Sequence, residues 1–343
     1  MFKILAITTR GLEGISANEL AALPGVTVDQ IAYRRILASC RGPLSSLLSL
    51  RTVDDVFLHL ATWPGMERAR QTLSTLRAVS AQLPLTIALE ACRQIRTIQG
   101  PPTFSVTANF VGKRNYSTAE IKQACAEGIL EQQNWHYSED DATADLNIRV
   151  FIEADTAVVG VRLAARSLSR RPYKQEHVPG SLKPAVAAAL LRLTDITPGT
   201  RILDPCCGAG TILIEASANR ATALGGDINP EAVTAACFNA VQAGVTVPIQ
   251  RWDARALPVS DRSVERVISN LPWGRAVNAD DSLDTLYKEI GKEIERILAP
   301  DGQAVILTNQ SQLIQFERLT CHRQIEISLF GQTPTIMIWS NRI

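Results

Sequence analysis

The stretch DPCCGAGT, residues 204–211, directly follows the apolar run RIL at residues 201–203. A turn between the end of a strand and the start of a helix is where α/β sheets bind nucleotides. Glycines let the backbone approach the ligand there, and the helix start offers free N–H groups. Gly208 and Gly210 supply those glycines, although G-x-G alone is a weak signal. We interpret the two adjacent cysteines of the turn as small, tightly packed loop residues.

From about residue 180 onward, short apolar runs alternate with helical patterns. We expect strands at 201–205, 221–228, 247–253, 266–272 and 302–309, and helices at 211–220, 230–244 and 281–300. This alternation predicts a doubly wound parallel α/β sheet. Two final β-rich runs, 323–330 and 334–341, are separated by the tripeptide GQT. That spacing favours a hairpin, so the sheet is expected to finish with an antiparallel edge.

Residues 1–179 indicate a mixed α+β region, most simply two small modules. We expect β-rich runs at 3–9 and 26–40, two strands within 146–164, and helices at 15–23, 43–61 and 66–83. A strand that begins at residue 103 leads through a basic turn into a helix, where Ser117 and Glu120 have capping-box spacing. The segment 165–181 is polar, basic and contains proline, which predicts a linker.

Composition and charge exclude several protein classes. The chain has 343 residues, is 46% hydrophobic and carries a formal net charge of +1, so the charge gives no sign of a polyanion partner. Seven cysteines form no C-x-x-C pair and accompany only four histidines, which argues against a structural zinc or a disulfide framework. No apolar stretch approaches the roughly 20 residues that cross a bilayer. We therefore expect a cytoplasmic protein without a metal or a membrane partner.

Acidic residues follow three successive predicted strands. Asp204 and Asp227 are 23 residues apart, about the spacing at which an acidic residue meets the ribose hydroxyls of a bound nucleoside. Asp253, in RWDA, can reach an adenine exocyclic amine. Each aspartate taken singly could instead be a helix N-cap. Their occurrence at three strand ends favours a nucleoside-containing cofactor.

The stretch SNLPWG, residues 269–274, is the most specific signal in the chain. The side-chain carbonyl of Asn270 and the backbone carbonyl of Leu271 can both accept hydrogen bonds from an exocyclic amine. Pro272 then fixes the turn, and the ring of Trp273 can stack on a planar base. The alternative is a buried tryptophan in a tight turn.

These motifs resemble those of class I S-adenosylmethionine-dependent methyltransferases that modify exocyclic amines. Together with ANFVGKRNYSTAEIKQACAEGI (108–129), NIRVFIEADTAVVGVRLA (147–164) and SLSRRPYK (167–174), they resemble THUMP-containing RNA methyltransferases, especially those that make N2-methylguanosine in tRNA. The resemblance implies a ferredoxin-like α+β module, a THUMP-like RNA-binding domain, a linker and a Rossmann-like methyltransferase domain, at residues 1–64, 65–166, 167–180 and 181–343. The chain departs from the family pattern at Leu271, where proline is common, and at Pro172, where glycine is frequent.

The resemblance also assigns residues to the cofactor, S-adenosylmethionine. The methionine portion falls to Asp204, Gly208 and Gly210, and the segment that closes over it to Ser181 and Leu182. The ribose falls to Asp227, and the adenine to Asp253. The cofactor-binding set is completed by Ile228, Ala254 and Asn270, and the catalytic set comprises Asn270, Leu271, Pro272 and Trp273.

The implied partner is tRNA, bound by a chain that we expect to be a monomer. A strand-end pocket can accept only an exposed or flipped-out nucleotide. The expected phosphate contacts are the basic residues Lys113, Arg114, Arg170, Arg171 and Lys174. Their alternative interpretation is a set of scattered solvated cations.

Other functions remain open at this point. The chain could be a ribosomal RNA or DNA amino-methyltransferase acting on guanine N2 or adenine N6, or an inactive methyltransferase fold that binds RNA. A dehydrogenase is disfavoured because the turn lacks G-x-G-x-x-G spacing. Methylation of pyrimidine C5 would need a cysteine beside the base. Neither the modified position nor the number of methyl groups follows from the sequence.

Overall fold

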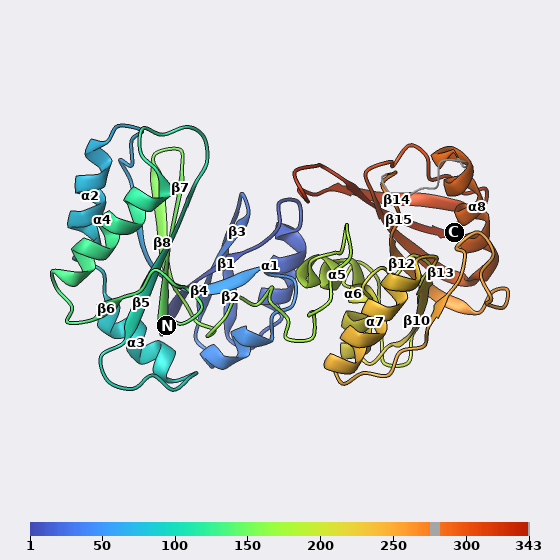
Figure 1. The fold of residues 1–343 in the computed structure, drawn as a ribbon, viewed down its shortest axis with the longest axis horizontal. Coiled ribbons are helices and arrows are strands. Elements are labelled where there is room, and N and C mark those ends of the chain that lie inside the picture. Colours follow the sequence, from blue (N-terminus) through green and yellow to red (C-terminus); the bar gives the residue numbers. More distant parts are fainter. Residues whose placement is uncertain (275–281, 342–343) are drawn as a thin grey trace. The chain divides into compact units, whose positions relative to one another are not determined.

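The computed structural model describes residues 1–274 and 282–341, which fold into two compact units. Unit 1 comprises Met1–Thr8 and Ala17–Leu168, and unit 2 comprises Thr9–Ser16 and Ser169–Ile343. Figure 1 colours the chain along its length, so that unit 1 runs mostly from blue to green and unit 2 from green to red.

Unit 1 is built on an eight-stranded mixed sheet with the order β2-β3-β1-β4-β8-β7-β5-β6. Its strands are β1 (Phe2–Ile7), β2 (Val26–Ala32), β3 (Arg35–Cys40), β4 (Asp55–Trp63), β5 (Thr103–Phe110), β6 (His136–Tyr137), β7 (Leu146–Glu153) and β8 (Thr156–Arg162). The helices are α1 (Glu13–Ala21), whose first turn belongs to unit 2, α2 (Gln71–Ser80), α3 (Leu85–Arg93) and α4 (Thr118–Leu130). Helices α2 and α4 pack closely at Gly128, because glycine has no side chain there. A Cβ on Gly128 would lie only 2.1 Å from the Arg77 carbonyl oxygen.

The helix expected at residues 43–61 is wrong. Only Leu44–Ser49 coils, as a short 3₁₀ helix, and Asp55–Trp63 forms the central strand β4. The run DVFLHLATW is rich in β-branched and aromatic residues, and strands on both sides pair with it. Sheet pairing therefore outweighs the helical pattern here. The capping box of Ser117 and Glu120 is confirmed, as are the two strands within 146–164.

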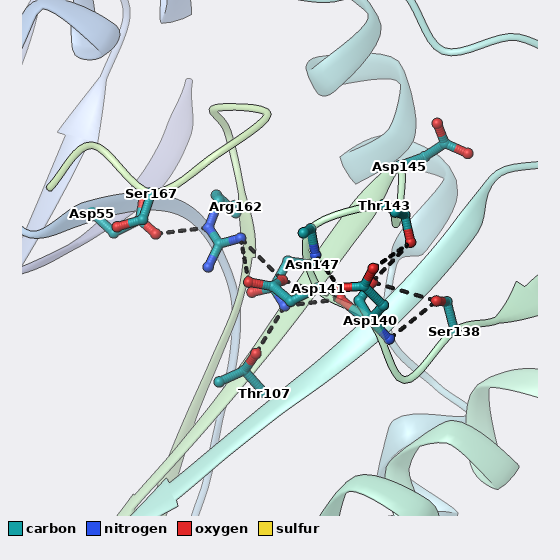
Figure 2. A network of polar contacts seen from close by, with 12 residues as sticks. Asp55, Thr107, Ser138, Asp140, Asp141, Thr143, Asp145, Asn147, Arg162 and Ser167 are labelled. Carbon is teal, nitrogen blue, oxygen red and sulfur yellow. Dashed lines mark hydrogen bonds and ion pairs between the residues drawn. The ribbon is translucent and has the colours of Figure 1, made fainter. Parts of the chain in front are cut away.

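A polar network ties together distant segments of unit 1 (Figure 2). The Arg162 guanidinium, at the end of β8, donates through Nε to Asp55 Oδ2 at 2.7 Å and contacts both oxygens of Asp141 at 3.0 Å. Burial raises the pKa of Asp55 although the Arg162 charge opposes the shift. Asn147 extends the network by donating to Ser105 and Thr107. The guanidinium thus joins β4, β8 and the loop before β7.

Unit 2 contains a seven-stranded sheet with the order β11-β10-β9-β12-β13-β15-β14. Its strands are β9 (Arg201–Asp204), β10 (Thr222–Asp227), β11 (Ile249–Arg251), β12 (Val264–Asn270), β13 (Leu298–Thr308), β14 (Leu319–Glu326) and β15 (Thr335–Asn341). The first five in the order are parallel, and β15 lies antiparallel between β13 and β14. The doubly wound sheet with an antiparallel edge is confirmed.

Within the described residues, this sheet is covered by α5 (Pro184–Leu191), α6 (Thr211–Ala218), α7 (Pro230–Gln242) and α8 (Leu283–Ile297). Neighbouring strand residues such as Ile202 and Leu203 belong to different buried clusters, because side chains alternate between the two faces of a strand. One cluster holds α5 and α6 and the other holds α8.

The helix expected at 281–300 is confirmed within the described residues, although its first residue, Asp281, lies outside them. No helix in the described ranges is both long and apolar enough to cross a bilayer.

Candidate active site at the carboxyl ends of the strands

Asp204 ends β9 and is almost fully buried. Its Oδ1 accepts a hydrogen bond from Ser269 Oγ at 2.7 Å and another from the backbone N–H of Cys206 at 3.2 Å. Burial raises the pKa of Asp204 to about 7, and these two hydrogen bonds only partly offset the effect. Ser269, in β12, was not among the site residues predicted from the sequence. Its hydrogen bond to Asp204 brings the glycine turn at 204–211 next to the SNLPWG turn.

The glycine turn is held by the aspartate of the next strand. The backbone N–H of Gly208 donates to Asp227 Oδ2 at 2.9 Å, which places the ends of β9 and β10 side by side. Gly208 and Gly210 both have positive φ, +52° and +76°. A Cβ on Gly210 would also approach the Cβ of Ala236 to 3.0 Å. The turn therefore requires glycine for backbone conformation and for packing on α7.

The remaining predicted nucleoside contacts lie along the same edge. Ile228 directly follows Asp227 and leaves 52% of its surface exposed, which gives the edge an apolar face. Ala254 is buried. The Asp253 carboxylate receives a bidentate contact from Arg255, at 2.7 to 3.0 Å, and this hydrogen bonding lowers the pKa of Asp253. Adenine recognition by Asp253 would therefore share the carboxylate with Arg255.

The thiols of Cys206 and Cys207 are expected to be unreactive. Burial raises the pKa of both Cys206 and Cys207 well above the usual thiol range, and the nearby Asp204 and Asp227 carboxylates add to the shift. A thiol held protonated in this way is a poor nucleophile. The structure thus supports their interpretation as packing residues.

The segment before α5 lies close to the glycine turn. Asn239 of α7 is fully buried and uses both ends of its amide: Nδ2 donates to the carbonyls of Ala209 and Glu176, and Oδ1 accepts from the N–H groups of Gln175 and Glu176. Sequence reasoning missed Asn239, because nothing in the helical pattern distinguishes it from a surface residue. Ser181 Oγ is buried without a hydrogen-bond partner in the described structure. Leu182 is buried beside it.

The SNLPWG turn continues from β12. The N–H of Leu271 donates to the Leu307 carbonyl at 3.0 Å, and the Leu271 side chain is fully buried. Trp273 is half-buried, and its indole Nε1 donates to Asn270 Oδ1 at 3.1 Å. The tryptophan is therefore not sealed in the interior. The geometry places an amide oxygen and an indole ring together at the strand end.

Helix α8 supports this turn through a residue that the sequence did not single out. The hydroxyl of Tyr287 bonds to the Pro272 carbonyl at 3.0 Å and to Thr308 Oγ1 at 2.5 Å. Burial raises the pKa of Tyr287 to about 12, so the hydroxyl stays protonated. In the sequence, Tyr287 looks like any apolar residue of an amphipathic helix.

The five predicted phosphate contacts differ in their surroundings. Lys113 and Arg170 are exposed. Arg114 donates to the carbonyls of Met66 and Glu67 and to the Tyr116 hydroxyl, so its guanidinium is used within unit 1. Arg171 lies 3.4 Å from the buried carboxylate of Glu215.

Lys174 points inward rather than toward solvent. Its ammonium donates to the Leu182 carbonyl and to Thr211 Oγ1, and burial lowers its pKa to about 8. The cations of this segment nevertheless line a pocket of about 480 Å³, to which Arg170, His177 and Lys183 also contribute.

A THUMP domain model matches residues 89–162, and an RMKL-like methyltransferase domain model matches residues 171–329. A curated tRNA (guanine(6)-N2)-methyltransferase from Thermus thermophilus is 30% identical over 318 residues, covering 90% of each chain. The chain belongs to the THUMP-domain RNA methyltransferases.

Further relatives agree with this family. The crystal structure of TrmN from Thermus thermophilus superposes over 100% of both chains with a TM-score of 0.81 at 26% identity. The human tRNA (guanine(6)-N(2))-methyltransferase THUMP3 is 28% identical over 225 residues, which is 61% of this chain but only 44% of the human protein.

A THUMP-domain methyltransferase uses S-adenosylmethionine, and the residues of this chain fit that group. The buried, unpartnered Ser181 Oγ, the glycine turn with positive φ and the exposed Ile228 beside Asp227 offer polar and apolar contacts along one edge. Asp204 supplies a carboxylate suited to a cationic ligand. When bound, the cofactor supplies an electrophilic methyl group on a sulfonium. Among the described residues, no cluster of three or more His, Cys, Asp or Glu could hold a metal ion.

Proposed function

We propose that this chain transfers a methyl group from S-adenosylmethionine to the exocyclic N2 amine of a guanosine in tRNA. The observation that carries the proposal is the Asn270–Trp273 turn, which lies at the end of β12 and is joined to the cofactor turn by the 2.7 Å bond from Ser269 to Asp204. The named tRNA guanine-N2 methyltransferases support the same activity, and they suggest position 6 of the tRNA.

The turn can activate a nucleobase amine without a covalent intermediate. The lone pair of such an amine is delocalised into the ring, so the amine is a weak nucleophile. Two acceptors, Asn270 Oδ1 and the Leu271 carbonyl, would bind the two N–H groups and orient the nitrogen for attack. Holding the reactants in this geometry lowers the barrier mainly through orientation. Proline in place of Leu271 would leave the backbone carbonyl unchanged, so the substitution keeps this role.

Trp273 would hold the base by its ring face. Its indole is oriented by the Nε1 hydrogen bond to Asn270, so the acceptor and the ring are fixed together. Stacking on an aromatic side chain is available to any base that has left its helix. The target nucleotide must therefore be accessible or flipped out.

Phosphate contacts would come from the exposed cations around the 480 Å³ pocket, with Arg170 and Lys183 as the leading residues. Lys113 of unit 1 would add a contact, in keeping with an RNA-binding role for residues 65–166. The proposal includes a monomeric enzyme that acts in the cytoplasm. Residues 1–64 would form the ferredoxin-like module and residues 167–180 the linker before the catalytic domain at 181–343.

Methylation of defined RNAs tests the proposal. The purified chain is incubated with tritiated S-adenosylmethionine and with transcribed tRNA, ribosomal RNA or duplex DNA, and the digested nucleosides are separated. N2-methylguanosine in tRNA is expected. Asn270→Ala should reduce transfer at least ~100-fold, whereas Asn134→Ala, at an exposed position in unit 1, should not. Label in N6-methyladenosine, or only in ribosomal RNA or DNA, would contradict the proposal.

A further inference from the structure

The connection between β14 and β15 has an unusual conformation. Leu329 and Gln332 exchange two backbone hydrogen bonds, at 3.0 and 2.9 Å, and so enclose a two-residue turn. Its central residues are Phe330 and Gly331, with φ of +53° and +74°. Positive φ at both positions is the signature of a type I′ turn, which prefers Asn, Asp or Gly.

Phenylalanine is a poor choice for this position. A bulky side chain with positive φ is a true conformational outlier, because its Cβ crowds the following carbonyl. Burial does not compensate, since Phe330 leaves 52% of its surface exposed. Its neighbours Ile327 and Leu329 are, in contrast, almost completely buried. The ring is therefore held in a strained, exposed position by a well-anchored turn, and such residues are concentrated at functional sites.

Several contacts fix the turn. Asn309 Nδ2 donates to Gln332 Oε1 at 2.8 Å, and the Ser328 N–H donates to the Arg10 carbonyl at 3.1 Å. Asn309 directly follows β13, so the tip of the hairpin is tied to the carboxyl edge of the sheet. The side chain of Phe330 is thus presented at that edge rather than on a distant surface.

The exposed ring lies beside the residue that is proposed to stack on the substrate base. The ring centroids of Phe330 and Trp273 lie 6.2 Å apart, and the ring planes are inclined by 60°. Both side chains keep accessible surface. Two inclined aromatic rings that are both partly exposed form an apolar corner, which suits a flat, largely apolar ligand such as a purine.

We propose that Phe330 is a second aromatic contact for the flipped-out base of the RNA substrate. This inference rests on the proposed function and deepens it. Trp273 provides one wall of the base site and Phe330 the other, so the hairpin tip holds the base at Asn270. Because dispersion and stacking do not read base identity, Phe330 contributes to capture and orientation of the base rather than to cofactor binding.

A substitution that suits the turn separates this role from a structural one. Phe330→Asn places a residue that tolerates positive φ in the type I′ turn, so the melting temperature should stay equal or rise. The same change removes the ring, so kcat/KM for tRNA methylation should fall at least ~10-fold, while affinity for S-adenosylmethionine, measured by calorimetry, stays unchanged. Phe330→Tyr keeps the ring and should keep activity within about threefold. Phe238→Asn, at an exposed phenylalanine on α7, is the matched control and should keep full activity.

The outcomes are distinguishable. A kcat/KM for Phe330→Asn within about twofold of the unmodified chain overturns the role of Phe330 and leaves the proposed function intact. Equal impairment of Phe330→Tyr and Phe330→Asn also overturns it, because the ring is then not what matters. If the unmodified chain transfers no methyl group to any RNA, the proposed function fails and this inference fails with it.

Discussion

The indole Nε1 of Trp273 donates a hydrogen bond to Asn270 Oδ1 at 3.1 Å, within the turn that follows β12. An indole N–H can only donate, so this bond fixes which end of the Asn270 amide is the oxygen. An amide oxygen has two lone pairs, and the second remains able to accept from a substrate amine. The indole ring of Trp273 and the amide oxygen of Asn270 are therefore oriented together.

Trp273→Phe tests whether this orientation matters apart from stacking. The variant keeps an aromatic ring but loses the donor, so Asn270 can rotate. We expect kcat to fall about tenfold, equivalent to about 1.4 kcal/mol, with KM for tRNA nearly unchanged. Trp273→Ala should raise KM as well. Steady-state methylation kinetics give both values, and a Trp273→Phe variant with normal kcat would show that the hydrogen bond is dispensable.

Asp204 should make stability depend on pH. Its folded pKa, about 7, is raised above the ordinary value of 3.8, so the folded state binds more protons between these two values. The stability contribution of Asp204 is fully present below pH 3.8 and is lost as pH rises through about 7. The melting temperature of the unmodified chain, relative to Asp204→Asn, should therefore fall between about pH 4 and 7. Asp253→Asn is the control, because the Asp253 pKa is lowered and no titration is expected in that window. A constant difference between the chain and Asp204→Asn would contradict the assignment.

The same carboxyl group should set the pH dependence of cofactor affinity. Above about pH 7 Asp204 becomes anionic and attracts the cationic cofactor more strongly. The dissociation constant for S-adenosylmethionine should therefore decrease between about pH 6 and 8. Asp204→Asn should bind more weakly and show a flat profile. Calorimetric titrations across this range measure the effect, and a parallel profile in both proteins would assign it to another group.

Tyr287→Phe tests the hydroxyl that supports the SNLPWG turn. The change removes the hydroxyl that joins the Pro272 carbonyl to Thr308, and it leaves the half-buried carbonyl and the buried Thr308 hydroxyl without that bond. A decrease of about 1–3 kcal/mol in the free energy of unfolding is expected, together with a lower kcat. Urea denaturation and methylation rates measure the two effects. Tyr33→Phe, at an exposed tyrosine, should change neither.

Much of the site follows from the sequence because parallel strands bring their carboxyl ends to one edge. The pattern predicts that Asp204, Gly208 and Asp227 lie together, and the 2.9 Å bond between Gly208 and Asp227 agrees with that expectation. The sequence does not predict strand β4, because residues 43–61 have a helical pattern. The strand forms by pairing with β1 and β8, which come from distant parts of the chain. Such pairing leaves no local signal.

Contacts between residues far apart in the sequence explain why the other features of the site were not predicted. Tyr287 and Phe330 contact Pro272 and Trp273, which lie 15 and 57 positions away in the sequence. Lys174 looks like a linker cation in the sequence, yet its ammonium is satisfied by Leu182 and Thr211. The sequence shows that Lys174 is a cation, but only the structure shows that its ammonium is directed into the protein.

The exposed and the buried cations of segment 169–184 should therefore affect different ligands, tRNA and S-adenosylmethionine. Arg170 and Lys183 are exposed at the pocket, so their replacement by Gln should weaken tRNA binding and reduce the slope of log K against log salt. The expected reduction is about 0.7–0.9 for each phosphate that the variant no longer neutralises. Lys174→Met should leave that slope unchanged. It removes the donor that joins Leu182 to Thr211, so it should instead weaken binding of S-adenosylmethionine by loosening the segment that holds Ser181 and Leu182.

Filter binding of tRNA between about 50 and 300 mM salt, paired with cofactor calorimetry, separates the two roles. Lys292→Gln, at an exposed position on α8, serves as the charge-matched control and should alter neither measurement. A reduced salt slope in Lys174→Met would mean that its ammonium leaves the interior to meet phosphate, which would contradict the buried arrangement. An unchanged slope in the Arg170 and Lys183 variants would place the RNA backbone on another surface of the enzyme.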